Sequence, residues 1–102
     1  MNRKVGMRVF AIRNSEAGRV YLYGFGTYEG DEAPDKEAQG VKGLSALCGG
    51  KNPKILLDNG KVVWGCECWW GPEEKFYEKF ANAQIIEVDI VAERMKQTGE
   101  IN

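Results

Sequence analysis

The dipeptide Asn59-Gly60 constrains this chain more than any other feature of its sequence. It separates two apolar runs in the stretch KILLDNGKVVWGCECWWG, residues 54–71. Both residues tolerate the positive φ angles of a type I′ turn, so the pattern predicts a β-hairpin closed by a two-residue loop. Such a loop places Ile55 opposite Trp64, and this register decides which side chains face the core.

Side chains alternate between the two faces of a strand, and one face of this hairpin is apolar throughout. We therefore expect that face to be buried. The second face is mixed, and a mixed face that contains a tryptophan is either half covered by the chain itself or used for contact. The expected core face consists of Ile55, Leu57, Val62, Trp64, Cys66, Cys68 and Trp70, and the mixed face of Leu56, Val63, Gly65, Glu67 and Trp69.

Length and charge limit the class of protein. The 102 residues suffice for one domain, residues 1–102, with its own core. The formal net charge is −1, whereas sequence-independent nucleic-acid binding depends on a basic excess. No apolar run of about 18 residues is present to span a bilayer, and the N-terminus lacks the apolar region of a signal peptide. We therefore expect a cytoplasmic protein without a membrane partner, and the charge balance argues against a nucleic-acid partner.

The cysteine and histidine content argues against most catalytic and metal sites. Without a signal peptide, the three cysteines are expected to be reduced. Cys66, Cys68 and Cys48 could in principle give three thiolates to zinc, but free cysteines on apolar faces usually pack as small hydrophobic groups. The absence of histidine removes the commonest general base and zinc ligand. We expect no metal and no cofactor.

The spacing of apolar residues predicts the element order β-β-α-β-β-α-β. We therefore predict an α+β fold, a single mostly antiparallel five-stranded sheet with two helices packed on one face. A partly closed barrel with the helices as plugs is the alternative. Outside the hairpin, strands are expected at residues 7–12, 20–28 and 85–90, helices at residues 35–48 and after Pro72 with an apolar stripe of Phe76, Tyr77, Phe80 and Ala83, and a short helical or frayed polar tail at residues 91–102.

The segment LYGFGTYEG, residues 22–30, resembles the RNP1 motif of RNA-recognition domains. It departs from that motif at Thr27, where an aromatic residue is expected, and no basic residue precedes it. The strand order also differs, because a short loop replaces the helix between the first two strands. Binding of single-stranded nucleic acid through Tyr21, Tyr23 and Phe25 is thus an alternative function, and half-buried strand aromatics are the plainer interpretation.

The pattern YGxGxYEGD, followed by DNGKVVWGCECWWGPEE, is similar to short uncharacterised proteins of bacteria, phages and mobile gene cassettes of the integron type. This resemblance implies a bacterial or mobile-element setting and no mechanism.

An acidic loop follows the second strand, with Glu29, Asp31, Glu32, Asp35 and Glu37. Its spacing does not fit a calcium-binding EF-hand loop, so a solvated surface is expected there.

We predict a non-enzymatic binding or assembly module that contacts a protein, a second copy or a small molecule. The alternative is a small-ligand enzyme with Glu67 or Asp31 as its acid/base. The predicted contact surface consists of Tyr28, Glu29, Asp31, Glu67 and Trp69.

Overall fold

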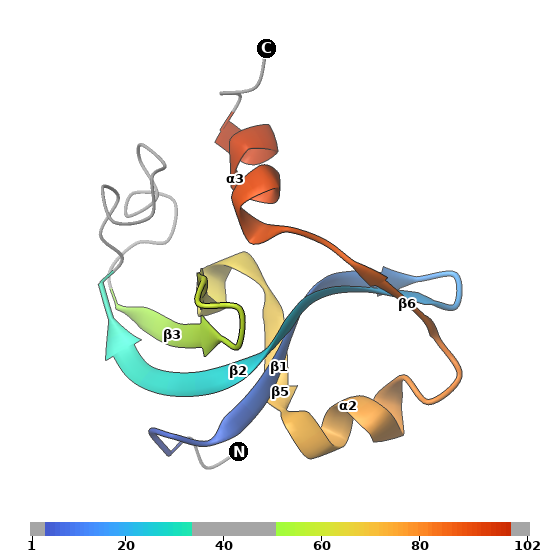
Figure 1. Ribbon diagram of the computed structural model, residues 1–102, viewed down its shortest axis with the longest axis horizontal. Coiled ribbons are helices and arrows are strands. Elements are labelled where there is room, and N and C mark those ends of the chain that lie inside the picture. Colours follow the sequence, from blue (N-terminus) through green and yellow to red (C-terminus); the bar gives the residue numbers. More distant parts are fainter. Residues whose placement is uncertain (1–3, 34–50, 99–102) are drawn as a thin grey trace.

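The computed structural model describes residues 4–33 and 51–98. Within these residues the fold is α+β, with a mostly antiparallel sheet and two α-helices (Figure 1). The sheet has six strands rather than the predicted five. The helix predicted at residues 35–48 lies outside the described residues. The elements are β1 (Arg8–Glu16), β2 (Arg19–Glu32), β3 (Asn52–Leu57), β4 (Val62–Trp64), the 3-10 turn η1 (Gly65–Glu67), β5 (Trp69–Pro72), α2 (Glu73–Lys79), β6 (Gln84–Glu87) and α3 (Ile90–Thr98).

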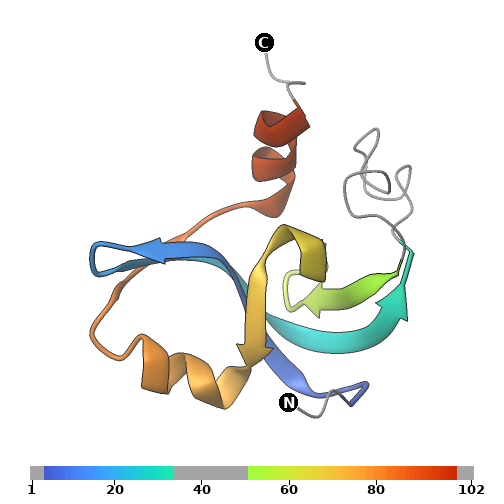
Figure 2. The same cartoon turned by 180° about the vertical axis from the view of Figure 1, so that it is seen from behind.

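The strand order is β4-β3-β2-β1-β5, and every pair in this row is antiparallel. β6 runs parallel to the first part of β2. The sixth strand arises because the second half of the predicted hairpin is divided. β4 stays with β3, whereas β5 crosses to pair with β1 and leads directly into α2 (Figure 2).

The division occurs at Gly65, where β3 offers Pro53 as the next partner. Proline has no backbone N–H and cannot donate to the ladder. The two backbones also lie close together, since a Cβ on Gly65 would lie 2.7 Å from the Cδ of Pro53. Pairing therefore ends after Trp64, and the chain turns into η1.

The hairpin is present, but its predicted register is wrong by one residue. Ile55 pairs with Val63, not with Trp64. The loop has three residues, because the N–H of Leu57 donates to the carbonyl of Lys61 at 2.8 Å. Within the loop Gly60 alone has a positive φ, of 88°. This geometry is a type I turn followed by a left-handed glycine bulge, which an Asn-Gly pair accommodates as well as a type I′ turn.

Both faces of β1 are buried, each in its own cluster. Ile90 of α3 belongs to the first cluster and Phe76 of α2 to the second, and Figure 1 shows the two helices on opposite sides of the β1–β2 pair. The helix predicted after Pro72 is confirmed as α2, but Tyr77 of its predicted stripe is 61% exposed. The first cluster comprises Val9, Ala11, Tyr23, Tyr28, Ile55, Leu57, Val63 and Ile90, and the second Phe10, Ile12, Val20, Leu22 and Phe76.

An irregularity in β2 separates the aromatic residues that the sequence placed on one face. Ala11 pairs with Gly24 and Ile12 with Leu22, so Tyr23 is an extra residue in the β2 ladder. Such a bulge reverses the alternation of side chains. Tyr23 accordingly lies in the first cluster, whereas Phe25 packs against the second. The common stacking face expected for nucleic-acid binding does not form.

Within the described residues, neither helix has both the length and the apolar character that crossing a membrane requires.

Candidate functional site

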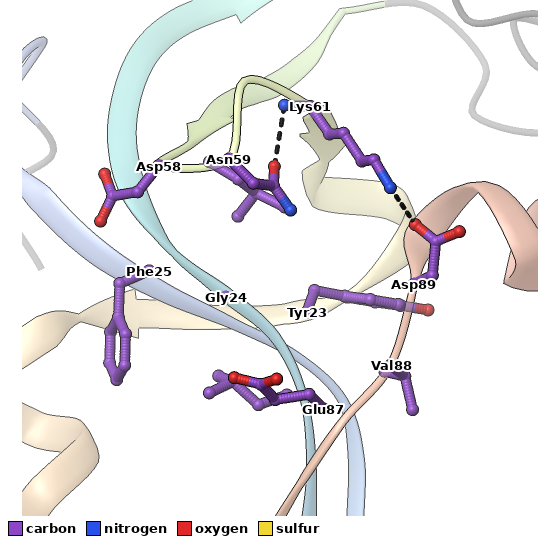
Figure 3. Close-up of a pocket in the computed structure, with 11 residues that line it drawn as sticks. Tyr23, Gly24, Phe25, Asp58, Asn59, Lys61, Glu87, Val88 and Asp89 are labelled. Carbon is purple, nitrogen blue, oxygen red and sulfur yellow. Dashed lines mark hydrogen bonds and ion pairs between the residues drawn. The ribbon is translucent and has the colours of Figure 1, made fainter.

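An open cleft with a volume of about 570 Å³ lies beside the bent part of β2 (Figure 3). Its walls come from three segments that are far apart in the sequence. Residues 22–25 of β2 form one side, the turn between β3 and β4 forms the second, and residues 87–89 between β6 and α3 form the third. The aliphatic part of the lining consists of Leu22, Leu57 and Val88.

Phe25 provides a rigid aromatic wall for this cleft. It is half-buried, and its ring stacks on Tyr77 of α2 with centroids 6.1 Å apart and planes at 15°. Phe76 contacts the same ring edge-to-face at 5.1 Å. Because α2 fixes Phe25 from behind, the ring is held in place without a ligand.

Three carboxylates line the cleft, and two of them are held by cations. Arg8 donates two hydrogen bonds to Asp58, at 2.8 and 2.7 Å, and this keeps the pKa of Asp58 below its ordinary value. Lys61 donates to Asp89 at 2.5 Å, and this lowers the pKa of Asp89. The third carboxylate, Glu87, is exposed and its side chain has no hydrogen bond or ion pair with any residue of the described ranges.

Tyr23 crosses the cleft with its ring, and its hydroxyl end lies on the side of Val88 and Asp89 (Figure 3). The residue is only 6% exposed, and the hydroxyl has no hydrogen-bond partner within the part of the chain that is described. Burial, followed by the nearby charge of Glu93, raises the pKa of Tyr23. The hydroxyl therefore stays protonated and keeps both a donor and an acceptor unused.

Asp89 joins the cleft to α3. Its side chain accepts a hydrogen bond from the backbone N–H of Ala92 at 3.3 Å, so Asp89 caps the first turn of the helix. One carboxylate thus serves as helix cap, partner of Lys61 and wall of the cleft. The position of the third wall consequently depends on how α3 is docked.

Glu67, a residue of the predicted contact surface, anchors that helix. Arg94 of α3 donates to its two carboxylate oxygens at 2.6 and 2.7 Å, and the two side chains are 3% and 5% exposed. The backbone N–H of Trp64 also donates to Glu67, at 3.0 Å. Both oxygens are therefore engaged inside the protein, so the structure gives Glu67 a supporting role rather than a place at the surface.

The structure does not bring the five predicted contact residues onto one surface. Tyr28 is buried, where it stacks on Trp70 with centroids 5.4 Å apart and donates its hydroxyl proton to Asp31 at 2.6 Å. Glu29 and Asp31 are exposed, as is Trp69 at 71%. Of the predicted surface, only these three side chains remain accessible. Asp35 and Glu37 of the acidic loop lie outside the described residues.

The two cysteines of the Cys-x-Cys motif have different environments. Cys66 is exposed and disulfide-bonded, so the expectation of three reduced thiols is wrong. Cys68 is a free thiol that packs against the first cluster and donates to the carbonyl of Trp64 at 3.5 Å. Burial raises the pKa of Cys68, so its thiol is unreactive at neutral pH. Within residues 4–33 and 51–98, no three Cys, Asp or Glu side chains are grouped so as to hold a metal ion.

The sequence does not single out Glu87 and Asp89, because the alternation of residues 85–90 predicts only a strand. The strand ends at Glu87, and Ile90 already belongs to α3. One local signal was available, since an aspartate directly before an apolar residue and a helix-forming run is a typical N-cap pattern. No local signal indicates that Arg94 lies against Glu67.

No protein-family model, curated protein or solved structure matches this chain. The similarity to mobile-cassette proteins stays a prediction, and the cleft has to be interpreted from its own chemistry.

Proposed function

We propose that this protein is a non-enzymatic binding module and that the cleft beside β2 is its contact site. The observation that supports this most directly is the pairing of a fixed aromatic wall, Phe25, with carboxylates that are themselves fixed. Asp58 is held by Arg8 and Asp89 by Lys61. Pre-organised aromatic and polar groups around an apolar floor are typical of recognition sites, because little side-chain freedom is lost on binding.

The titration behaviour of the cleft supports binding over acid/base catalysis. A general acid or base works best with a pKa near the working pH. The pKa values of Asp58 and Asp89 are lowered, and that of Tyr23 is raised. All three groups therefore keep one protonation state around neutral pH. Glu67, proposed from the sequence as a candidate acid/base, already has both oxygens engaged by Arg94.

The surroundings of the cleft favour a protein partner over an enclosed small molecule. The cleft is open, and Tyr77, which is 61% exposed, extends its aromatic wall onto the surface. Exposed aromatic residues of this kind often carry much of the energy of a protein interface. A bound segment would therefore fill the cleft with one side chain and contact Tyr77 with its neighbours.

Nuclear magnetic resonance tests this function without requiring an identified partner. The ¹⁵N-labelled protein is titrated with capped tripeptides of the form acetyl-Gly-X-Gly-amide, where X is varied over the natural side chains. We expect saturable shifts of the amide signals of Gly24, Asn59 and Val88, while Gly18 in the distant β1–β2 turn stays unchanged. Absence of saturable shifts at the cleft with every peptide would contradict the proposed function.

A further inference from the structure

We propose that the cleft binds the basic side chain of a protein partner, a lysine ammonium or an arginine guanidinium, with Glu87 as the counter-ion. This inference rests on the proposed function and names the chemistry of the group that the cleft selects.

The charges around the cleft are unequal. Its lining has the three carboxylates of Asp58, Glu87 and Asp89 but only one amine, that of Lys61. Asp58 and Asp89 are neutralised by Arg8 and Lys61. Glu87 has no cationic partner in the described part of the chain. An incoming cation would therefore pair with Glu87 and would not have to displace an existing ion pair.

The aromatic wall favours the same kind of ligand. A cation within about 6 Å of a ring centroid is attracted by the negative face of the ring. Phe25 and the Tyr77 ring stacked on it present such a surface beside the acidic lining. The protein uses this combination elsewhere in its own fold, where the guanidinium of Arg13 lies 4.3 Å from the centroid of Tyr21 and pairs with Glu93 at 3.5 Å.

The aliphatic side chains of the cleft lining suit the stem of a basic side chain. Lysine and arginine carry apolar methylene groups that pack on hydrophobic surface while the charged end stays polar. Leu22, Leu57 and Val88 offer that surface. This lining differs from a simple acidic patch, because carboxylates, an aromatic ring and aliphatic side chains line one cleft.

The test compares charged peptides with neutral peptides of matched shape. Acetyl-Gly-Arg-Gly-amide is paired with its citrulline analogue, and the lysine peptide with its acetyl-lysine analogue, in titrations of the wild type, Glu87→Gln and Glu29→Gln. Glu29 is a matched control, since it is exposed on β2 but lies outside the cleft. In the wild type and Glu29→Gln we expect the charged peptides to bind about tenfold more tightly than the neutral ones.

Glu87→Gln is expected to remove that preference while leaving the amide spectrum outside the cleft unchanged, because Glu87 is exposed. Equal affinity of charged and neutral peptides in the wild type, or an undiminished preference in Glu87→Gln, would overturn the inference and leave the proposed function standing. Tighter binding of free agmatine than of the arginine peptide would overturn the assignment to a protein partner. If no peptide binds, the proposed function itself fails.

Discussion

Arg94 on the last helix and Glu67 in the 3-10 turn form a buried, two-point ion pair, with Nε–Oε2 and Nη2–Oε1 distances of 2.6 and 2.7 Å. A third hydrogen bond from Arg94 reaches the carbonyl of Val62 at 2.6 Å. The pair thus ties α3 to both sides of the β4–η1 corner. Because α3 begins directly after Asp89, it also holds the third wall of the cleft.

Arg94→Met should destabilise the protein by about 3–5 kcal/mol, because it leaves the buried Glu67 carboxylate without a counter-ion. The double variant Glu67→Gln/Arg94→Met should recover a substantial part of that loss. The glutamine amide at position 67 carries no charge and still accepts the hydrogen bond from the N–H of Trp64. Urea unfolding followed by tryptophan fluorescence measures both free energies.

The matched control is Lys75→Ala, which breaks the exposed Lys75–Glu78 pair on α2. We expect a change below about 0.5 kcal/mol for this variant, as for most exposed ion pairs. If Arg94→Met costs no more than Lys75→Ala, the pair does not anchor α3.

Local patterns in the sequence predicted the position of the hairpin and of α2, but not how the hairpin is paired. Asn59-Gly60 is compatible with a two-residue type I′ loop and with a three-residue loop that ends in a glycine bulge. The structure has the second form, and one residue of shift moves Val63 into the place predicted for Val62. Pro53 could have signalled the end of β4, but only once the register that places it opposite Gly65 is known.

The candidate site was harder to predict than the fold because it depends on contacts between distant segments. The sequence indicated an aromatic and acidic surface, and the cleft has that chemistry with different residues. Glu67 is drawn inside by Arg94, and Tyr28 by stacking on Trp70. Phe25 and Glu87 line one cleft only because β6 lies parallel to the start of β2. A parallel pairing between segments so far apart leaves no short-range pattern.

Asp58 and Asp89 should make the folded state sensitive to acid. The pKa of each carboxyl is lowered in the folded protein by its cationic partner, Arg8 or Lys61. A group with a lowered folded pKa stabilises the protein above its unfolded pKa, about 4 for aspartate, and loses that contribution as the pH falls through the folded value. Unfolding midpoints measured from pH 6 to pH 2 should therefore decrease more steeply for the wild type than for Asp58→Asn. Parallel curves would mean that the Arg8–Asp58 pair does not contribute.

Trp69 and Trp64 should respond differently to truncation. Trp69 is 71% exposed, whereas Trp64 is 2% exposed. We expect Trp69→Ala to change the free energy of unfolding by less than about 0.5 kcal/mol, and Trp64→Ala to cost about 3–5 kcal/mol. If urea unfolding shows that both variants lose the same free energy of unfolding, the exposed position of Trp69 is contradicted. Sedimentation of folded Trp69→Ala beside the wild type then tests whether this side chain supports self-association, which would appear as an oligomer present only in the wild type.

The two cysteines of the Cys-x-Cys motif give a direct chemical test of the structure. The chain has three cysteines, Cys66 is disulfide-bonded and Cys68 is free. Ellman's reagent should therefore titrate fewer than three thiols per chain in denaturant without reductant, and three after reduction. In the native protein the thiol of Cys68 should react slowly, because burial raises its pKa and only the thiolate attacks the reagent. Three thiols in the unreduced, denatured chain would rule out the disulfide, and fast reaction of the native protein would place Cys68 at the surface.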